Sequence, residues 1–344
     1  MLDCRQTAMT KFAWTVAGLY GFIALLHAVG WGAYLHYSAL HPALVGLGLA
    51  AYLLGLRHAF DADHIAAIDD TVRLMLQQGT RPVAVGFWFS LGHATVVFAM
   101  AASTFLVADA MARHIPELKS AGAIIGGTVS GAFLWLVGIL NLVVLMDIFR
   151  AWRAAKRHPG HGHDHVDELL AQRGFLNRIF GSWARRALRH SWQMYPLGLL
   201  FGLGFDTATE VSLLALTAGA TAGSLPAPAI LALPVLFAAG MCAMDTTDGI
   251  LMVKAYSWAF VNPLRKLFYN LTITGLSVAV ALAVGTIQLI QVAIDVLNLH
   301  GAFFEYVDAI ELAEAGYWIV VVFLAGWAVS VLAWRLRRGD GVPA

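Results

Sequence analysis

The sequence has few charged residues: Asp, Glu, Lys and Arg make up 12% of its 344 residues, against about a quarter in soluble domains. Hydrophobic residues make up 59%, and the mean hydropathy is +0.71. These values exclude an ordinary soluble domain. The net charge of +1 gives no reason to expect a nucleic-acid partner.

Cysteine is also scarce, and two motifs are missing: one of nucleotide-binding proteins and one of metalloproteases. Cys4 and Cys242 lie in different segments, so neither a disulfide nor a thiolate zinc site is expected. The chain has no Gly-x-x-x-x-Gly-Lys-Ser/Thr loop, so we expect it to use no ATP itself. It has no His-Glu-x-x-His helix of the metalloprotease kind either.

Long apolar runs are abundant. Several exceed the ~20 residues that cross a bilayer as a helix, and the strict alternation of β-barrel strands is missing. The sequence therefore predicts an all-α polytopic membrane protein, with eight transmembrane helices in a single domain over 1–344. The predicted spans are 12–37, 43–68, 83–108, 122–147, 195–218, 227–252, 267–294 and 315–336.

The basic residues predict the orientation of these spans, because Lys and Arg accumulate on the cytoplasmic side. With both termini cytoplasmic, all but Arg57, Arg113 and Lys119 of the 22 Lys and Arg residues lie inside, Arg73 among them. The longest connection, 148–194, is then a basic cytoplasmic loop that contains histidines. We expect a multi-pass protein of the cytoplasmic membrane.

The second predicted span ends in an unusual stretch at 57–65, Arg-His-Ala-Phe-Asp-Ala-Asp-His-Ile. An ionisable side chain near the bilayer centre costs at least ~2.5 kcal/mol on insertion scales, so such residues usually mark a function. On a continuous helix, His58, Asp61 and His64 fall within about 120° of one face, and Asp63 points elsewhere. Imidazole and carboxylate donors on an interior face predict binding of a first-row divalent metal.

Four more carboxylates lie inside apolar runs. Asp206 and Glu210 are four residues apart in the fifth span, and Asp245 and Asp248 are three apart in the sixth, so each pair shares a helix face. One pair alone could be structural. Two pairs, together with the motif at 57–65, favour a polar interior that binds metal.

Three histidine features are less decisive. His93 follows Gly92 in the third span, where the glycine allows another helix to approach closely, and we assign His93 to the site. His27, in the middle of the first span, is either a packing residue or a residue lining the site. The histidines at 158–165 either bind metal loosely or belong to a flexible linker.

Four motifs of the chain resemble those of the nickel/cobalt transporter family, the one-component permeases for Ni²⁺ and Co²⁺. They lie, in the family's order, at 57–65, 92–97, 203–210 and 240–249. The resemblance implies an eight-helix permease with high-affinity uptake of Ni²⁺ or Co²⁺ as its substrate, with no cofactor and no ATPase subunit. The site residues it implies are His58, Asp61, Asp63, His64, His93, Asp206, Glu210, Asp245 and Asp248. It also makes His27 the candidate for the choice between the two metals.

Two other functions stay open from the sequence. One is an exporter of the same metals, with the histidines at 158–165 collecting ions in the cytoplasm. The other is an intramembrane metalloenzyme, although the histidines are too few for a multi-histidine di-metal centre. The motif match favours import by a secondary carrier that is not an enzyme.

Overall fold

The computed structural model describes residues 2–106, 108–157, 188–203, 226–259, 263–312, 316–322 and 325, and every regular element in these ranges is helical. Five helical segments are long and apolar enough to cross a membrane: Phe12–Leu40, Val85–Ser103, Ala123–Val143, Ala227–Ala255 and Thr274–Leu297. They confirm five of the predicted spans. The chain is an all-helical, multi-pass membrane protein.

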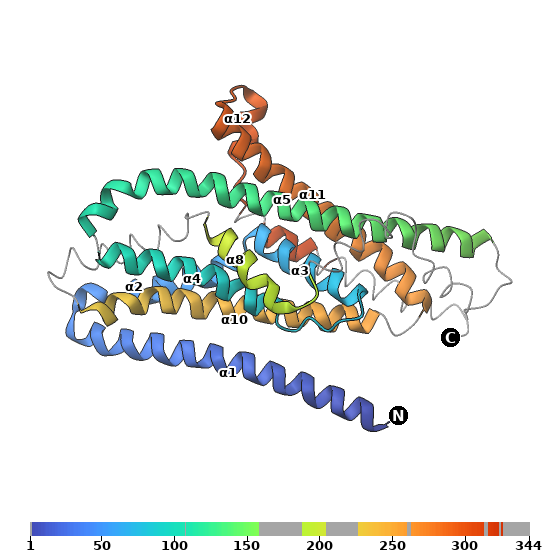
Figure 1. Cartoon of the computed structure of the whole chain (residues 1–344), viewed down its shortest axis with the longest axis horizontal. Helices are drawn as coiled ribbons and strands as arrows, with labels where there is room; N and C mark the ends of the chain where they lie inside the picture. The colour runs from blue at the N-terminus through green and yellow to red at the C-terminus, as the bar shows by residue number, and fades with distance from the viewer. Residues whose placement is uncertain are drawn as a thin grey trace.

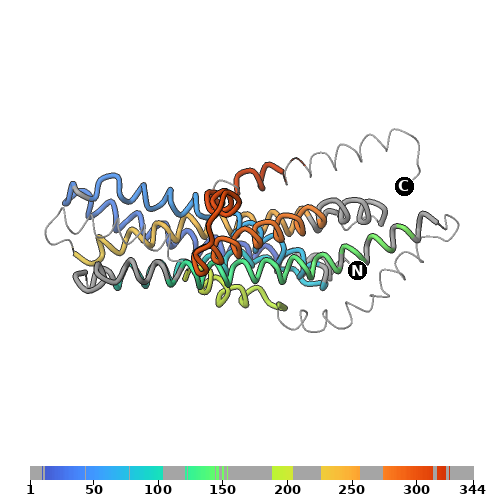
Figure 2. The backbone as a smooth tube through the Cα atoms, turned by 90° about the horizontal axis from the view of Figure 1, so that it is seen from above, coloured from blue at the N-terminus to red at the C-terminus, as the bar shows by residue number. Residues whose placement is uncertain are grey.

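The long helices run roughly along the longest axis of the molecule, with α1 along one edge and α5 beside α11 along the other (Figures 1 and 2). They are α1 (Leu2–Leu40), α4 (Val85–Leu106), α5 (Ala108–Arg157), α10 (Ala227–Ala259) and α11 (Pro263–Leu297). Three shorter elements accompany them: α8 (Met194–Gly202) and two 3-10 turns, η1 (Pro42–Leu44) and η2 (Ser191–Gln193). The helix α5 extends beyond the predicted span 122–147 at both ends.

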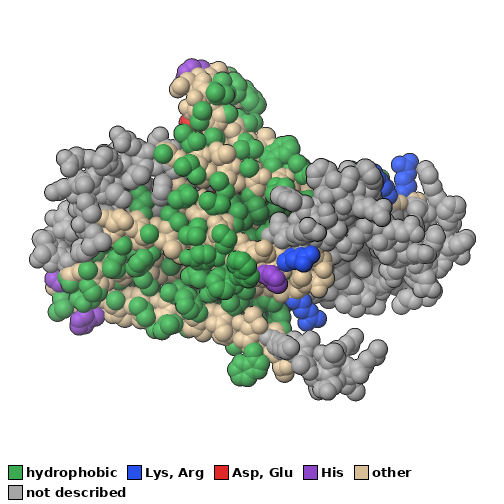
Figure 3. Space-filling view, viewed as in Figure 1, with side chains coloured by type: hydrophobic (Ala, Val, Ile, Leu, Met, Phe, Trp, Pro, Cys, Tyr) green, Lys and Arg blue, Asp and Glu red, His purple; other side chains and the backbone are tan. Residues whose placement is uncertain are grey.

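The surface of the bundle is apolar. Hydrophobic side chains cover much of the face drawn in Figure 3, and exposed ones on α1 and on α2 (Leu47–His58) include Trp14, Leu25, Leu35 and Leu53. Lys and Arg side chains on this face lie toward the end where α1 begins and α5 finishes (Figures 1 and 3). An apolar belt with charges at one end is what helices facing lipid require.

A short helix, α12 (Ala302–Asp308), projects from the bundle at the end of α11 (Figure 1). The Gln291 side chain of α11 donates hydrogen bonds to the carbonyls of Val307 and Ile310, at 3.1 and 3.0 Å. These bonds attach α12 to the bundle.

The predicted span 43–68 is not one helix, which corrects the continuous helix face expected for its ionisable residues. It consists of α2 (Leu47–His58) and α3 (Ala62–Gln77). Between them, the N–H groups of Phe60 and Asp61 donate to the carbonyls of Arg57 and His58 in short turns of 2.9 Å. Asp61 is extended, with φ −63° and ψ 143°, and occupies the N-cap position that favours Asp.

Neighbouring protein covers this helix break. Gly316 packs against the backbone of Phe60 and Ala62, and a Cβ atom at residue 316 would collide with the Phe60 carbonyl. The Phe60 ring stacks on Tyr317 with centroids 5.5 Å apart. The irregular backbone at 59–61 is therefore packed against protein that comes from a distant part of the chain.

Candidate metal centre

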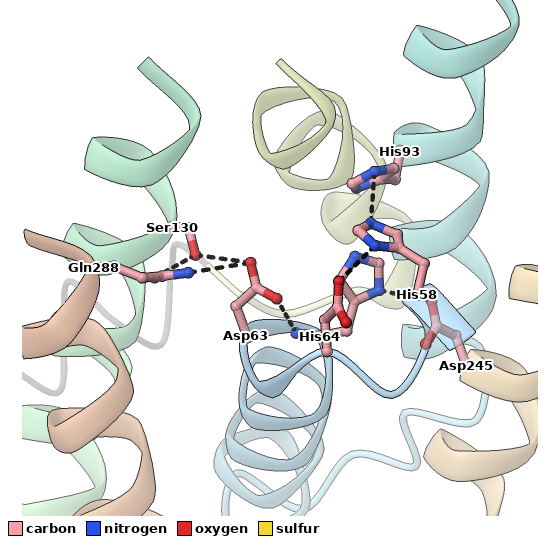
Figure 4. Close-up of polar contacts among 8 residues, drawn as sticks. His58, Asp63, His64, His93, Ser130, Asp245 and Gln288 are labelled. Carbon is pink, nitrogen blue, oxygen red and sulfur yellow. Dashed lines mark hydrogen bonds and ion pairs between the residues drawn. The ribbon is translucent and has the colours of Figure 1, made fainter. Parts of the chain in front are cut away.

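Three imidazoles converge at the helix break (Figure 4). His58 is the last residue of α2, His64 lies in the first turn of α3, and His93 lies in the middle of α4. The ring centroids are 4.5 to 4.9 Å apart in each pair, and one nitrogen from each ring lies within 4.8 Å of the other two. His64 and His93 are buried, with exposed fractions of 0% and 5%. The geometry is that of a possible three-histidine metal centre.

The helix break brings two of these rings together. On a continuous helix, residues six apart such as His58 and His64 are rotated by about 120° and separated by about 9 Å along the axis. The turn at 59–61 folds the chain so that the two rings meet instead. Their proximity was predicted, but its cause is the interruption of the helix.

Two carboxylates orient the histidines. The Nδ1 atom of His58 lies 2.6 Å from Asp61 Oδ2, and the Nδ1 atom of His64 lies 3.2 Å from Asp245 Oδ2. A histidine whose Nδ1–H donates to a carboxylate keeps its Nε2 lone pair for a metal, and the carboxylate raises the basicity of the ring. Asp61 and Asp245 therefore prepare His58 and His64 as ligands.

The nitrogen spacing also suits an ion. The Nε2 atoms of His58 and His93 are 3.1 Å apart. Two nitrogens each about 2.1 Å from one ion, and about 95° apart around it, have the same separation of about 3.1 Å. The buried His64 Nε2 and His93 Nδ1 atoms make no hydrogen bond within the described residues. A buried polar atom without a partner costs about 1–3 kcal/mol, and a metal bound at His64 Nε2 would remove this cost there.

Glycines bring the surrounding helices close enough to build the centre. A Cβ atom at Gly92 of α4 would collide with the Tyr195 carbonyl of α8, which confirms the close approach predicted for Gly92. Gly198 of α8 similarly faces the backbone of Phe89 and His93. On the other side, Gly86 of α4 packs against the backbone of Asp245 in α10. The bare backbones at these positions set the depth of His93 and Asp245 in the bundle.

Asp63 points away from the histidines, as its place in the sequence predicted. Its Oδ1 atom accepts the backbone N–H of His64 at 2.9 Å, so it caps the first turn of α3. Its Oδ2 atom accepts hydrogen bonds from Gln288 Nε2 at 3.2 Å and from Ser130 Oγ at 3.4 Å (Figure 4). Arg57 is exposed and forms no ion pair with Asp63 in the described structure.

Two further predicted site residues, His27 and Asp248, make no contact with the three histidines in the described structure. The Nδ1–H of His27 donates to the Ile23 carbonyl at 2.8 Å, and its Nε2 lies 3.2 Å from the Tyr52 hydroxyl, so both ring nitrogens are engaged. Asp248 is part-buried one turn beyond Asp245 on α10, and its buried Oδ2 has no hydrogen-bond partner within the described residues. The second predicted pair of carboxylates lies outside the described ranges: Asp206 and Glu210. Their place in the site stays a prediction.

A second polar cluster, which was not predicted, lies further along α3. Its members, which we call the Arg73 network, are Asp69, Asp70, Arg73, Asn141, Thr274 and Ser277. Arg73 is 2% exposed, which corrects its predicted place among the solvated cytoplasmic cations. The spacing of Asp69 and Arg73, four residues apart on one helix face, was a signal for this network.

Ser130 and Gln288 were missed as well. Both are uncharged and lie on long apolar helices, so they resemble ordinary interhelical packing residues. Only the fold reveals that they meet Asp63 beside the histidines.

Comparison with known proteins identifies transporters that are similar to this chain over most of its length. A family model described as "High-affinity nickel-transport protein" matches residues 44–333. "Nickel transporter NixA" of Staphylococcus aureus is 46% identical over 316 residues, which cover 92% of this chain and 93% of that protein. "Nickel transporter NicT" of Mycobacterium tuberculosis is 45% identical over 346 residues, with 96% and 92% covered.

A relative named for transport of a different metal is nearly as similar. "Cobalt transport protein NhlF" of Rhodococcus rhodochrous is 42% identical over 341 residues, which cover 94% of this chain and 95% of that protein. No solved structure gives a significant match.

Proposed function

Because this chain belongs to the family of high-affinity nickel-transport proteins, we propose that it imports Ni²⁺, with Co²⁺ as a second substrate, across the cytoplasmic membrane. The observation that carries the proposal is the convergence of His58, His64 and His93, the last two of them buried, at the break between α2 and α3. Transporters commonly bind their substrate at discontinuous helices near the bilayer midplane.

The donors suit a borderline first-row metal. Imidazole nitrogens bind Ni²⁺ and Co²⁺ well, and they exchange a transported ion more readily than a cage of thiolates. In this proposal the three histidines bind the ion directly. Asp61 and Asp245 hold His58 and His64 in the required tautomer and contribute negative charge. Asp63 does not bind the ion in this proposal; it positions His64 by accepting its backbone N–H.

The full transport unit in this proposal is one permease domain of eight spans with both termini in the cytoplasm. Besides the five helices that meet the length criterion, it includes the broken helix α2–α3, a span that begins with α8, and a last span around 316–336. The 148–194 segment then joins two spans on the cytoplasmic side. An inside-negative potential drives entry of a dication by ~4.6 kcal/mol per 100 mV, twice the value for one charge.

Metal content after expression tests this function. Cells of a strain without nickel uptake should accumulate ⁶³Ni when they express the chain, and excess Co²⁺ should compete more strongly than Zn²⁺ or Mn²⁺. His58→Ala should abolish accumulation, whereas His36→Ala, a change at an exposed histidine of α1, should leave it intact. A fall in cellular nickel would identify an exporter. No change in nickel content with well-expressed protein would reject transport of this metal.

A further inference from the structure

Four helices are joined to one another through their backbones. Gly55 of α2 faces the Phe237 backbone of α10, and Gly240 of α10 faces the backbone of α2 in return. Gly86 joins α4 to α10, while Gly92 and Gly198 join α4 to α8. Helices in such close contact cannot shift against one another without backbone collisions. We call α2, α4, α8 and α10 the first body.

A second set of helices is held together by a glycine contact and by hydrogen bonds. Gly131 of α5 and Gly285 of α11 each face the other's carbonyl oxygen, at 3.0 and 2.9 Å from the Cβ position. At the start of α3, Asp63 accepts a hydrogen bond from Gln288 of α11, and the single hydroxyl proton of Ser130 of α5 is shared between Gln288 Oε1 at 2.7 Å and Asp63 Oδ2 at 3.4 Å. One carboxylate thus joins three helices.

The Arg73 network repeats this connection further along α3. The Asp70 carboxylate accepts a hydrogen bond from the Asn141 side chain of α5 at 2.6 Å. The Arg73 guanidinium donates to Thr274 and Ser277 of α11 at 2.9 and 2.6 Å. Buried polar contacts on this scale fix the register of α3 on α5 and α11. We call α3, α5 and α11 the second body.

The boundary between the bodies has a different character. Along it, α3 packs into a hydrophobic core that includes Phe89 of α4 and Val253 of α10, with Ala62, Ala66, Ala67, Ile68, Val72 and Met75 as its own members. This packing is apolar apart from the contact between His64 and Asp245, so it restrains α3 less than the hydrogen bonds to α5 and α11 do. The chain crosses the boundary at the helix break 59–61 and again near Gly79, whose φ is +80°.

The three histidines straddle this boundary. His58 and His93 lie on the first body and His64 lies on the second. The His64 side chain reaches across to Asp245 of the first body. A bound ion would therefore link the bodies, and their separation would remove one of its three imidazoles.

We propose that α3, α5 and α11 move as one unit against α2, α4, α8 and α10, and that this movement takes the metal centre apart to release the ion. The inference rests on the proposed transport function. Asp63, Ser130 and Gln288 are positioning residues in this account, because they make His64 follow α5 and α11. Loss of an outer-sphere partner of a metal ligand weakens metal binding by about 10–100-fold. Loss of an imidazole ligand itself should weaken binding at least as much, which is enough to release a captured ion.

A reversible cross-link tests the movement. Cys4→Ser and Cys242→Ala give a background without thiols. In it, Ile68→Cys with Gly249→Cys bridges the two bodies, since the Cβ position of residue 249 lies 3.6 Å from Ile68 Cγ2. The matched control is Gly138→Cys with Leu282→Cys, which bridges α5 and α11 within the second body, 3.2 Å from the Cβ position to Leu282 Cγ.

In proteoliposomes, oxidation or a short bis-thiol reagent should lower ⁶³Ni uptake by the 68/249 pair at least tenfold, with recovery on reduction. Equilibrium Ni²⁺ binding to the cross-linked protein should persist, and the 138/282 pair should transport in both states. If the cross-linked 68/249 protein takes up ⁶³Ni at half the rate of the same protein after reduction, or faster, the proposed movement is wrong. Absence of uptake in the thiol-free parent would instead overturn the proposed function.

A second variant tests the inference without cysteines. Ser130→Ala with Gln288→Ala disconnects Asp63 from α5 and α11, so we expect a maximal uptake rate about tenfold lower and Ni²⁺ binding within threefold of wild type. Thr286→Ala is the control, because it removes a different hydrogen bond between α5 and α11, from Trp135 at 3.1 Å. An unchanged rate in the double variant, or an equal loss of rate and binding, would contradict the positioning role.

Discussion

The helix α3 carries two buried polar clusters that differ in whether they contain their own cation. The Arg73 network pairs the Arg73 guanidinium with Asp69 and surrounds both with side-chain hydroxyls. The histidine cluster has two carboxylates and no Lys or Arg among the contacts that the structure describes. Buried charge needs a counter-charge: the first cluster holds a guanidinium beside its carboxylates, whereas the second has no guanidinium or ammonium group and is suited to an ion from outside.

Among the variants that test this contrast, His64→Ala should have the largest effect on uptake. It removes a ligand from the cluster that depends on an outside ion, and it also frees the Asp245 carboxylate. We expect uptake to fall by more than about a hundredfold, because a two-histidine site binds a trace metal poorly. The amount of protein in the membrane should stay within twofold of wild type. Uptake within tenfold of wild type would remove His64 from the site.

Arg73→Ala should instead lower the amount of folded protein. It leaves Asp69 without its guanidinium in the bundle core, and breaking a buried pair costs about 3–5 kcal/mol. We expect loss of the folded protein from the membrane, measured by fluorescence-detected size exclusion. Adding Asp69→Asn should restore part of the protein, since the carboxylate that Arg73 paired with is then neutral too. A stable but inactive Arg73→Ala protein would instead place Arg73 in the transport machinery.

The carboxylates that orient the histidines should give a smaller effect. Asp61→Asn and Asp245→Asn keep the size of each side chain and remove its charge. Outer-sphere partners of this kind are worth about 10–100-fold in metal affinity, so we expect the apparent affinity for Ni²⁺ to weaken by that factor. Titration of purified protein measures it, with Asp308→Asn on the exposed α12 as the control. Unchanged affinity would show that the two carboxylates do not support the ligands.

Acidification should also weaken the apparent affinity for Ni²⁺. Protons compete with metal for imidazole nitrogens, and an ordinary histidine is protonated below a pKa of about 6.5. Lowering the external pH from 7 to 5.5 should therefore weaken the apparent Ni²⁺ affinity by about tenfold, with recovery at neutral pH. Initial rates of ⁶³Ni uptake over a concentration series would test this. An apparent affinity that does not change with pH would contradict histidine ligation.

His27→Asn should give the smallest effect. Both ring nitrogens of His27 are engaged away from the three histidines, so any influence on the metal must pass through Tyr52 and α2. We expect the ratio of Ni²⁺ to Co²⁺ uptake to shift by about threefold, equivalent to less than 1 kcal/mol, with little change in maximal rate. Tyr52→Phe removes the same hydrogen bond and should cause a similar shift. A shift with His27→Asn alone would indicate a more direct role.

The sequence predicted which histidines come together, but not the helix break that brings them together. Ionisable residues in apolar runs are conspicuous, so His58, His64 and His93 could be recognised from hydropathy and motifs alone. The break at 59–61 could not, because Ala-Phe-Asp within an apolar run is compatible with a continuous helix. Its cause is partly remote in the chain: Gly316 and Tyr317 cover the irregular backbone.

The Arg73 network escaped prediction for a related reason. An arginine beyond an apolar run normally indicates the cytoplasmic end of a span. Here α3 continues inside the bundle, where α5 and α11 supply Asn141, Thr274 and Ser277 as partners. Whether a polar residue is solvated or buried depends on helices that are distant in sequence, and hydropathy alone does not contain that information.

X-ray absorption spectroscopy of the Ni²⁺-loaded, purified protein tests the central claim most directly. Three imidazole ligands should give the multiple-scattering pattern of histidine, a first shell of nitrogen and oxygen at about 2.1 Å, and no sulfur. The pattern should weaken by about a third in His93→Ala, if that variant still retains metal. A first shell of oxygen alone, or an imidazole pattern that is unchanged when His58, His64 and His93 are all replaced, would contradict the account.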